Sequence, residues 1–138
     1  MRGPASLSGK IEPVIVKPSA FGYAVTAARL DKALSKRGLT VFARIDHAAA
    51  ARGVDLELPP EEVLIFGSPR AGTPLMQRDP RIGYELPLRI LLWQEGELVL
   101  LGYRDPVELA GDYEVGEGRA NLERMAALLA ELAAEAAG

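Results

Sequence analysis

Residues 66–76, FGSPRAGTPLM, combine the residue types that most often build a ligand site, because an apolar run meets glycines, prolines, hydroxyl groups and an arginine. Gly67 and Gly72 keep the glycine spacing of a phosphate-binding loop, but Thr73 stands where that loop needs a lysine. Pro69 and Pro74 also remove two backbone amides that a phosphate would contact. The dinucleotide-binding glycine pattern is absent as well, so nucleotide binding of either kind is not expected.

The same stretch fits a junction between a strand and a helix. Ser68–Pro69 and Thr73–Pro74 each join a helix-capping residue to a proline suited to a first helical turn. One or both pairs are expected to open a helix that ends near residues 78–79. A helix start exposes free amides, so a small anionic ligand could bind there, with nearby arginines. The candidate ligand-binding residues are Ser68, Arg70, Gly72, Thr73 and Arg78, and Arg81 lies close in sequence.

Asp46 and His47 form the second candidate, and His47 is the only histidine in the chain. Adjacent residues of a strand point to opposite faces, so the two cannot form a hydrogen-bonded pair if the strand continues through them. If the strand ends there, Asp46 caps a short helix over residues 47–52, with Gly53 past its end. An alternative function is a small enzyme using His47 as general base, supported by Asp46, Ser68 or Arg70.

Composition narrows the possible functions. The 138 residues are 49% hydrophobic and 25% charged, with a net charge of −3 and no cysteine. One compact domain over residues 11–138 is expected, preceded by a flexible arm over residues 1–10. The acidic balance argues against nucleic acid or anionic membranes as partners. One histidine with scattered carboxylates predicts no metal site and no cofactor.

The N-terminal segment lacks an apolar signal-like run, and no stretch is apolar over a membrane-spanning length. A soluble protein that stays in the cytoplasm is therefore expected. Asparagine, glutamine and cysteine are scarce while proline and arginine are frequent, which is typical of heat-adapted proteins.

The expected elements are a strand, a helix, four strands with short helical interruptions and a long C-terminal helix. Ser19 is expected to cap the first helix, in which Phe21, Val25 and Ala28 recur at helical spacing before Gly38 ends it. Strands are predicted at residues 11–17, 39–47, 63–67, 86–94 and 97–103. Hairpins with segregated helices predict an α+β two-layer domain with an antiparallel sheet.

Three of these elements carry a more specific expectation about burial or position. Residues 39–47 alternate between apolar and polar, which predicts a strand with one buried face. Pro87 cannot donate to a sheet ladder, so an edge or a bulge is expected at that position. The C-terminal helix carries an apolar stripe that can pack on its own subunit or form a dimer seam. The stripe consists of Leu122, Met125, Leu129, Leu132 and Ala136.

Four motifs together carry a family resemblance: residues 45–51 (IDHAAAA), 66–76, 86–91 (LPLRIL) and 103–106 (YRDP). In this order they resemble the prokaryotic family known as domain of unknown function 302. Ser68 stands where the family often has asparagine, and Glu85 where it often has aspartate. The resemblance implies an α+β fold similar to the TATA-binding-protein-like architecture, a homodimer and no established reaction. A homodimeric small-molecule-binding or accessory module is the function we favour.

Overall fold

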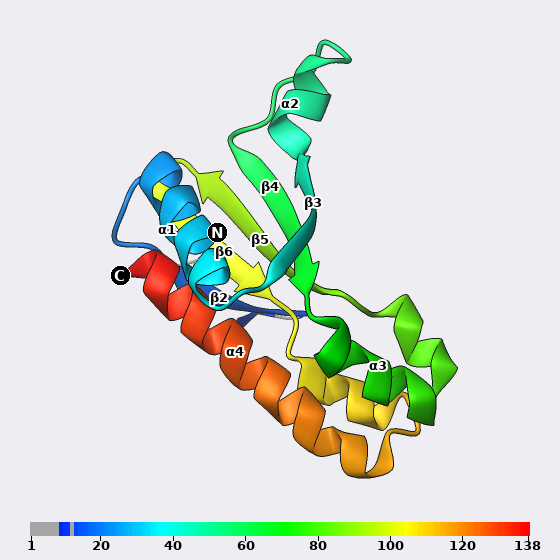
Figure 1. Ribbon diagram of the computed structural model, residues 1–138. Coiled ribbons are helices and arrows are strands. Elements are labelled where there is room, and N and C mark those ends of the chain that lie inside the picture. Colours follow the sequence, from blue (N-terminus) through cyan, green and yellow to red (C-terminus); the bar gives the residue numbers. More distant parts are fainter. Residues whose placement is uncertain (1–8, 12) are drawn as a thin grey trace.

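The computed structural model describes residues 9–11 and 13–138, which form an α+β domain with one antiparallel sheet. Six strands lie in the order β1-β2-β6-β5-β4-β3, and every neighbouring pair is antiparallel. Helices lie against one face of this sheet, so the two-layer prediction is confirmed (Figure 1). The strands are β1 (Gly9–Ile11), β2 (Val14–Pro18), β3 (Thr40–Asp46), β4 (Glu61–Gly67), β5 (Leu88–Glu95) and β6 (Leu98–Tyr103).

Besides the sheet, the described residues form four α-helices and three 3-10 turns. Helices α1 and α4 form the layer over the sheet, whereas α3 packs beside it (Figure 1). The helices are α1 (Tyr23–Lys36), α2 (His47–Arg52), α3 (Pro69–Arg78) and α4 (Arg119–Ala137). The 3-10 turns are η2 (Pro80–Tyr84), η3 (Pro106–Gly111) and η4 (Gly116–Gly118).

The C-terminal helix packs within its own subunit. Its predicted stripe is buried throughout, and Leu129, Leu132 and Ala136 contact side chains of α1 and of the central strands. The N-terminal part of the stripe, Leu122 and Met125, joins a second cluster with α3 and η3. Of the two alternatives for the stripe, packing on its own sheet is therefore the one the fold uses.

The N-terminal elements differ from the prediction. Residues 11–17 form parts of two strands, because the chain turns at Pro13 and β1 pairs back onto β2. The expected flexible arm lies mostly outside the described residues, but its last two residues, Gly9 and Lys10, belong to β1. Ser19 does not cap α1, since Gly22 holds that position and the Ser19 hydroxyl instead contacts Thr26 Oγ1 at 2.6 Å.

Strand β3 is an exposed edge of the sheet, contrary to the expected half-buried strand. Only one of its two edges is hydrogen-bonded, to β4, and the register of this pair is irregular between Val41 and Ala43. Val41, Phe42 and Ile45 remain 40%, 52% and 42% exposed. Large apolar side chains are thus left open to solvent at this edge, which is unusual for an unpartnered strand.

The central hairpin was predicted closely. Strands β5 and β6 are joined at Gly96, which has a φ of +58° that glycine adopts without strain. Pro87, however, lies neither at an edge nor at a bulge, because β5 is a central strand that begins one residue later. The proline therefore costs the ladder no hydrogen bond.

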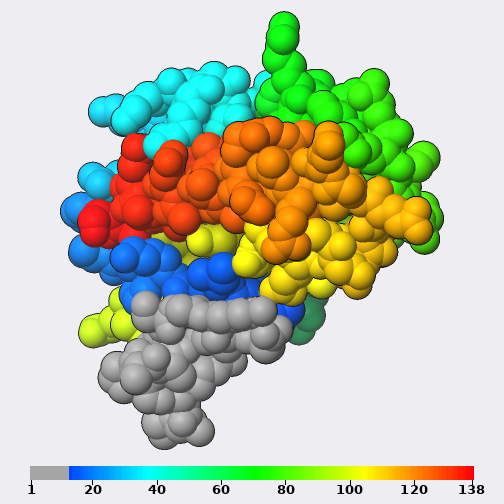
Figure 2. All heavy atoms as spheres, turned by 90° about the horizontal axis from the view of Figure 1, so that it is seen from below, coloured from blue at the N-terminus to red at the C-terminus, as the bar shows by residue number. Residues whose placement is uncertain are grey.

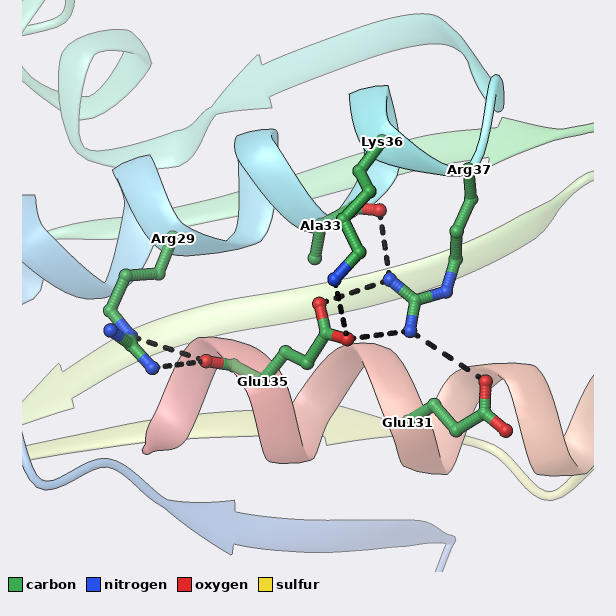
Figure 3. Close-up of polar contacts among 6 residues, drawn as sticks. All are labelled: Arg29, Ala33, Lys36, Arg37, Glu131 and Glu135. Atoms are coloured by element: carbon green, nitrogen blue, oxygen red, sulfur yellow. Dashed lines mark hydrogen bonds and ion pairs between the residues drawn. The ribbon is translucent and has the colours of Figure 1, made fainter.

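A polar contact fixes the end of α4 on α1 (Figure 3). The Glu135 carboxylate accepts from Arg37 Nη1 and Nη2 at 3.0 and 2.8 Å, and Lys36 Nζ lies 3.4 Å away. Arg29 donates to the backbone oxygens of Glu135 and Ala136. Hydrogen bonding from Arg37 lowers the pKa of Glu135 from 4.5 to about 2.

Replacing Glu135 by glutamine should make the protein less sensitive to acid. A carboxylate whose pKa is lowered on folding stabilises the fold fully above its unfolded pKa, and this contribution disappears as the pH falls through the folded value. Between about pH 4.5 and 2, the wild-type stability should therefore fall more steeply than that of Glu135→Gln. Urea unfolding at several pH values measures both slopes. Parallel profiles for the two proteins would contradict the prediction.

Candidate binding pocket beside helix α3

The FGSPRAGTPLM segment joins β4 to α3, as the junction hypothesis predicted. Ser68 has extended backbone angles at the N-cap, and Pro69 is the first residue of the helix. The Ser68 carbonyl accepts from the amides of Ala71 and Gly72 at 3.0 and 3.2 Å, whereas its hydroxyl caps no amide. Thr73–Pro74 does not open a helix, because Pro74 lies inside α3.

An apolar pocket of about 240 Å³ lies between this segment and three other parts of the chain. Figure 2 shows the face on which α4 (orange to red) lies next to α3 (green) and to the start of β3 (cyan). Ser68 and Thr73 contribute the only hydroxyl groups among its lining residues. The walls are Leu39 and Phe42, residues 67–69, residues 71–73, Met76, residues 86–88, and Met125 and Leu128 of α4.

The predicted ligand-binding residues are only partly brought together. Ser68, Gly72 and Thr73 line the pocket, and Arg70 lines an adjoining hollow that shares Ser68 with it. Arg78 lies at the opposite end of α3, where its guanidinium is 3.6 Å from Glu117. Arg78 therefore does not line this pocket.

Arg81 is also occupied elsewhere. It pairs with the buried Asp79, whose carboxylate accepts from Arg81 Nη2 at 2.7 Å and from the Glu114 amide at 3.0 Å. These hydrogen bonds, chiefly that from Arg81, hold the pKa of Asp79 well below its usual range. Asp79 thus ties η2 to the chain before η4 and has a structural role.

Asp46 and His47 lie far from this pocket. The Asp46 carboxylate accepts from the Ala49 amide at 2.8 Å and caps α2, with Gly53 at its end, so the capping hypothesis is confirmed. In the β3–β4 ladder, the backbone of Asp46 lies opposite that of Glu62. Gly67 lies at the other end of β4, roughly 17 Å from Glu62 at about 3.3 Å per residue. His47 is the first residue of α2, and α2 and α3 lie at opposite ends of β4 (Figure 1). His47 therefore cannot act with Ser68 or Arg70.

A charged cluster that sequence reasoning missed lies between α1 and β3–β4. Arg44 Nη1 donates to the Glu62 carboxylate at 2.9 Å, and Arg44 Nη2 also contacts Asp31. Glu62 is only 7% exposed. Burial, together with the Glu62 carboxylate, raises the pKa of Tyr23 beside this cluster. In the described part of the chain, no acidic or histidine side chains are grouped so that they could hold a metal ion.

The apolar walls of the pocket were missed for a different reason. Leu39, Leu86 and Met125 are far apart in sequence and belong to segments predicted for other roles. The only sequence signal was that two family-like motifs, residues 66–76 and 86–91, both contribute to the pocket.

Comparison with known proteins identifies the family. The family model described as "Domain of unknown function DUF302" matches residues 15–132. The chain belongs to this family. A solved DUF302 structure, the uncharacterized conserved protein from Bacillus stearothermophilus, superposes with a TM-score of 0.81 at 18% identity, covering 91% of this chain and 99% of that one. The fold of the two proteins is therefore shared.

Relatives of this DUF302 chain occur in Brucella. Proteins named "Fluoride-specific ion channel FluC 1" from Brucella suis biovar 1 (strain 1330) and Brucella abortus biovar 1 (strain 9-941) are each 39% identical to it over 104 residues. The match takes in 75% of this chain but only 41% and 38% of those proteins. The chain thus spans about two fifths of the length of these relatives. Among the described residues, no helix has the length and apolar character to cross a membrane.

Proposed function

We propose that this DUF302 domain is a homodimeric accessory module that binds an apolar small molecule in the pocket beside α3. The observation that carries this proposal is the lining of that pocket, which is apolar apart from two hydroxyl groups. Ligand sites are typically concave and mostly apolar, with a few polar groups that orient the ligand. Cavities of about 150 Å³ with apolar walls already hold a benzene molecule, so this pocket is large enough for a small organic ligand.

The small anion that the sequence left possible as a ligand fits this pocket poorly. A bare anion would lose its hydration against apolar walls, and two of the three arginines considered for it are paired with Glu117 and Asp79. An apolar body in the pocket avoids this cost. The enzyme alternative based on His47 also loses its support, because neither Ser68 nor Arg70 lies near that histidine.

A substitution at Gly72 tests the pocket directly. A Cβ there would lie 3.5 Å from Leu86 and 3.8 Å from Met76, which are ordinary contacts, and would point among the pocket walls. Gly72→Ala should therefore raise the unfolding free energy by about 0.5–1 kcal/mol through its better helix propensity. Gly72→Val should remain folded but fill the pocket and weaken binding of 1-octanol about tenfold or more, measured by calorimetry. Equal octanol affinity in Gly72→Val and wild type would refute this location.

The second copy of the proposed dimer would bind at the β3 edge. Two identical edge strands can pair antiparallel about a two-fold axis. Ile45 also continues an apolar row through Val63 and Leu91. These residues alternate with the helix-facing Leu64 and Ile90, so the row lies on the face that α1 and α4 leave uncovered. A standard interface needs roughly 800 Å² from each partner, more than one strand edge provides, and this row supplies further apolar area.

Light scattering of Ile45→Lys tests the dimer. The wild type should have twice the mass of one chain, and the variant should be monomeric, because lysine places a charge in an apolar contact. Val25→Lys is a matched control, since Val25 is 51% exposed and belongs to α1 rather than to β3. A dimeric Ile45→Lys, or a monomeric wild type, would rule out this interface.

The Brucella relatives suggest a setting for such a module. We propose that their ion conduction resides in the part outside the match, and that the matching part is an attached binding domain. Two observations support this division. The match takes in only 38–41% of those relatives, and the described residues contain no helix that could cross a membrane. Added to fluoride-loaded liposomes, the present chain should release no more fluoride than protein-free liposomes. Release that increases with protein concentration would contradict the division.

A cytoplasmic location and heat adaptation stay proposals from composition. Native mass spectrometry of the protein purified from its own organism would report the assembly and any retained ligand together. A dimer with an added organic mass is the expected result. A melting temperature within the ordinary mesophile range of about 45–65 °C would contradict heat adaptation.

A further inference from the structure

The apolar pocket continues into a second, shallower hollow that contains positive charge. Both hollows are lined by Ser68, Ala71, Met125 and Leu128, so they adjoin along the contact between α3 and α4. The second hollow adds only polar residues, namely Arg70, Asn121 and Arg124. An apolar cavity therefore opens toward two guanidinium groups.

These two arginines differ from most others in the described chain. Arg37, Arg44, Arg78, Arg81, Arg104 and Arg119 each lie within ion-pair distance of a carboxylate. Within the part of the chain that the structure describes, Arg70 and Arg124 form no such pair, and the polar side-chain contact of Arg124 is to Asn121 Oδ1. No acidic residue lines either hollow. The protein has a net charge of −3, but this part of its surface has two arginines and no acidic lining residue beside an apolar cavity.

We propose that the ligand is an amphiphilic carboxylate, whose hydrocarbon body fills the apolar pocket while its carboxylate reaches Arg70 and Arg124. This inference rests on the proposed function, because it names the class of molecule that the same pocket binds. Guanidinium groups bind carboxylates through paired, charge-assisted hydrogen bonds. Ser68 lines both hollows, and its hydroxyl, which caps no helix amide, is a further donor for the same carboxylate.

The proposed ligand combines a possibility left open by the sequence with a feature found in the structure. The free amides and nearby arginines at the start of α3 suggested that a small anion could bind there, whereas the structure provides an apolar cavity. An amphiphilic carboxylate uses both, and its charge stays near solvent, where desolvation costs little. Acetate, which lacks the apolar body, should gain little from the pocket.

Calorimetry with octanoate, 1-octanol and acetate tests the inference on the full chain. Octanoate should bind about fivefold or more tightly than octanol, and acetate should not bind measurably. Arg70→Gln and Arg124→Gln should each weaken octanoate about fivefold and leave octanol unchanged. Arg78→Gln, at the other end of α3, is the matched control and should leave both affinities unchanged. Added salt should weaken octanoate binding alone.

The outcomes separate the two proposals. Octanol that binds as tightly as octanoate, with no effect of Arg70→Gln or Arg124→Gln, would overturn the carboxylate inference and leave the apolar pocket in place. Failure of both octanoate and octanol to bind would overturn the pocket and the inference together. Binding of acetate at the affinity of octanoate would show a plain anion site and would also overturn the inference.

Discussion

Truncating Leu132 to alanine is expected to lower the free energy of unfolding by about 3 kcal/mol. Leu132 is fully buried in the cluster that joins α4 to α1 and the central strands. The loss combines the removed apolar burial with the cavity left behind, because the packed sheet beneath cannot collapse fully. Urea unfolding monitored by circular dichroism measures the change.

The control for Leu132→Ala is Val25→Ala on α1. Val25 is 51% exposed, so its truncation should change stability by less than about 0.5 kcal/mol. A loss below about 1 kcal/mol for Leu132→Ala would contradict the packing of α4 on its own sheet.

Replacing Arg44 by methionine is expected to cost about 2 kcal/mol. The substitution removes the cation beside Glu62, a nearly buried carboxylate that would then lose its ion pair. Breaking a buried pair from one side is strongly destabilising, and the partial exposure of Arg44 reduces the effect here. Chemical unfolding of the purified variant provides the measurement.

A double variant separates loss of charge pairing from loss of packing. Adding Glu62→Gln to Arg44→Met should recover part of the lost stability, because the unpaired carboxylate is then gone. Arg89→Met is the control, since Arg89 is exposed and forms no ion pair with the described residues. No recovery in the double variant would show that the cost of Arg44→Met comes from packing alone.

Local sequence signals predicted the elements that depend on neighbouring residues. The cap of α2 by Asp46, the start of α3 at Pro69 and the β5–β6 turn at Gly96 were all indicated by residues within a few positions of each other. Capping and turn chemistry act over that range, so one sequence is enough to indicate them. The buried stripe of α4 was predicted in the same way from its periodicity.

Features that depend on sheet order could not be predicted. Alternation in β3 suggested one buried face, but only the position of β3 at the edge of the sheet leaves Phe42 and Ile45 exposed. The pocket likewise requires Leu39, Leu86 and Met125 to meet from three separate segments. The arginines near α3 were equivalent in the sequence. Only packing shows that Arg78 is paired with Glu117, whereas Arg70 has no ion-pair partner among the described residues.

The central claim is that the pocket beside α3 binds an apolar ligand body. Carbon-13 labelling of methionine methyl groups tests it most directly, because Met76 and Met125, the methionines of the described residues, both line the pocket. On titration with 1-octanol, both resonances should shift and saturate together, and neither should shift in Gly72→Val. Resonances that stay unchanged in the wild type, or that move equally in Gly72→Val, would contradict the claim.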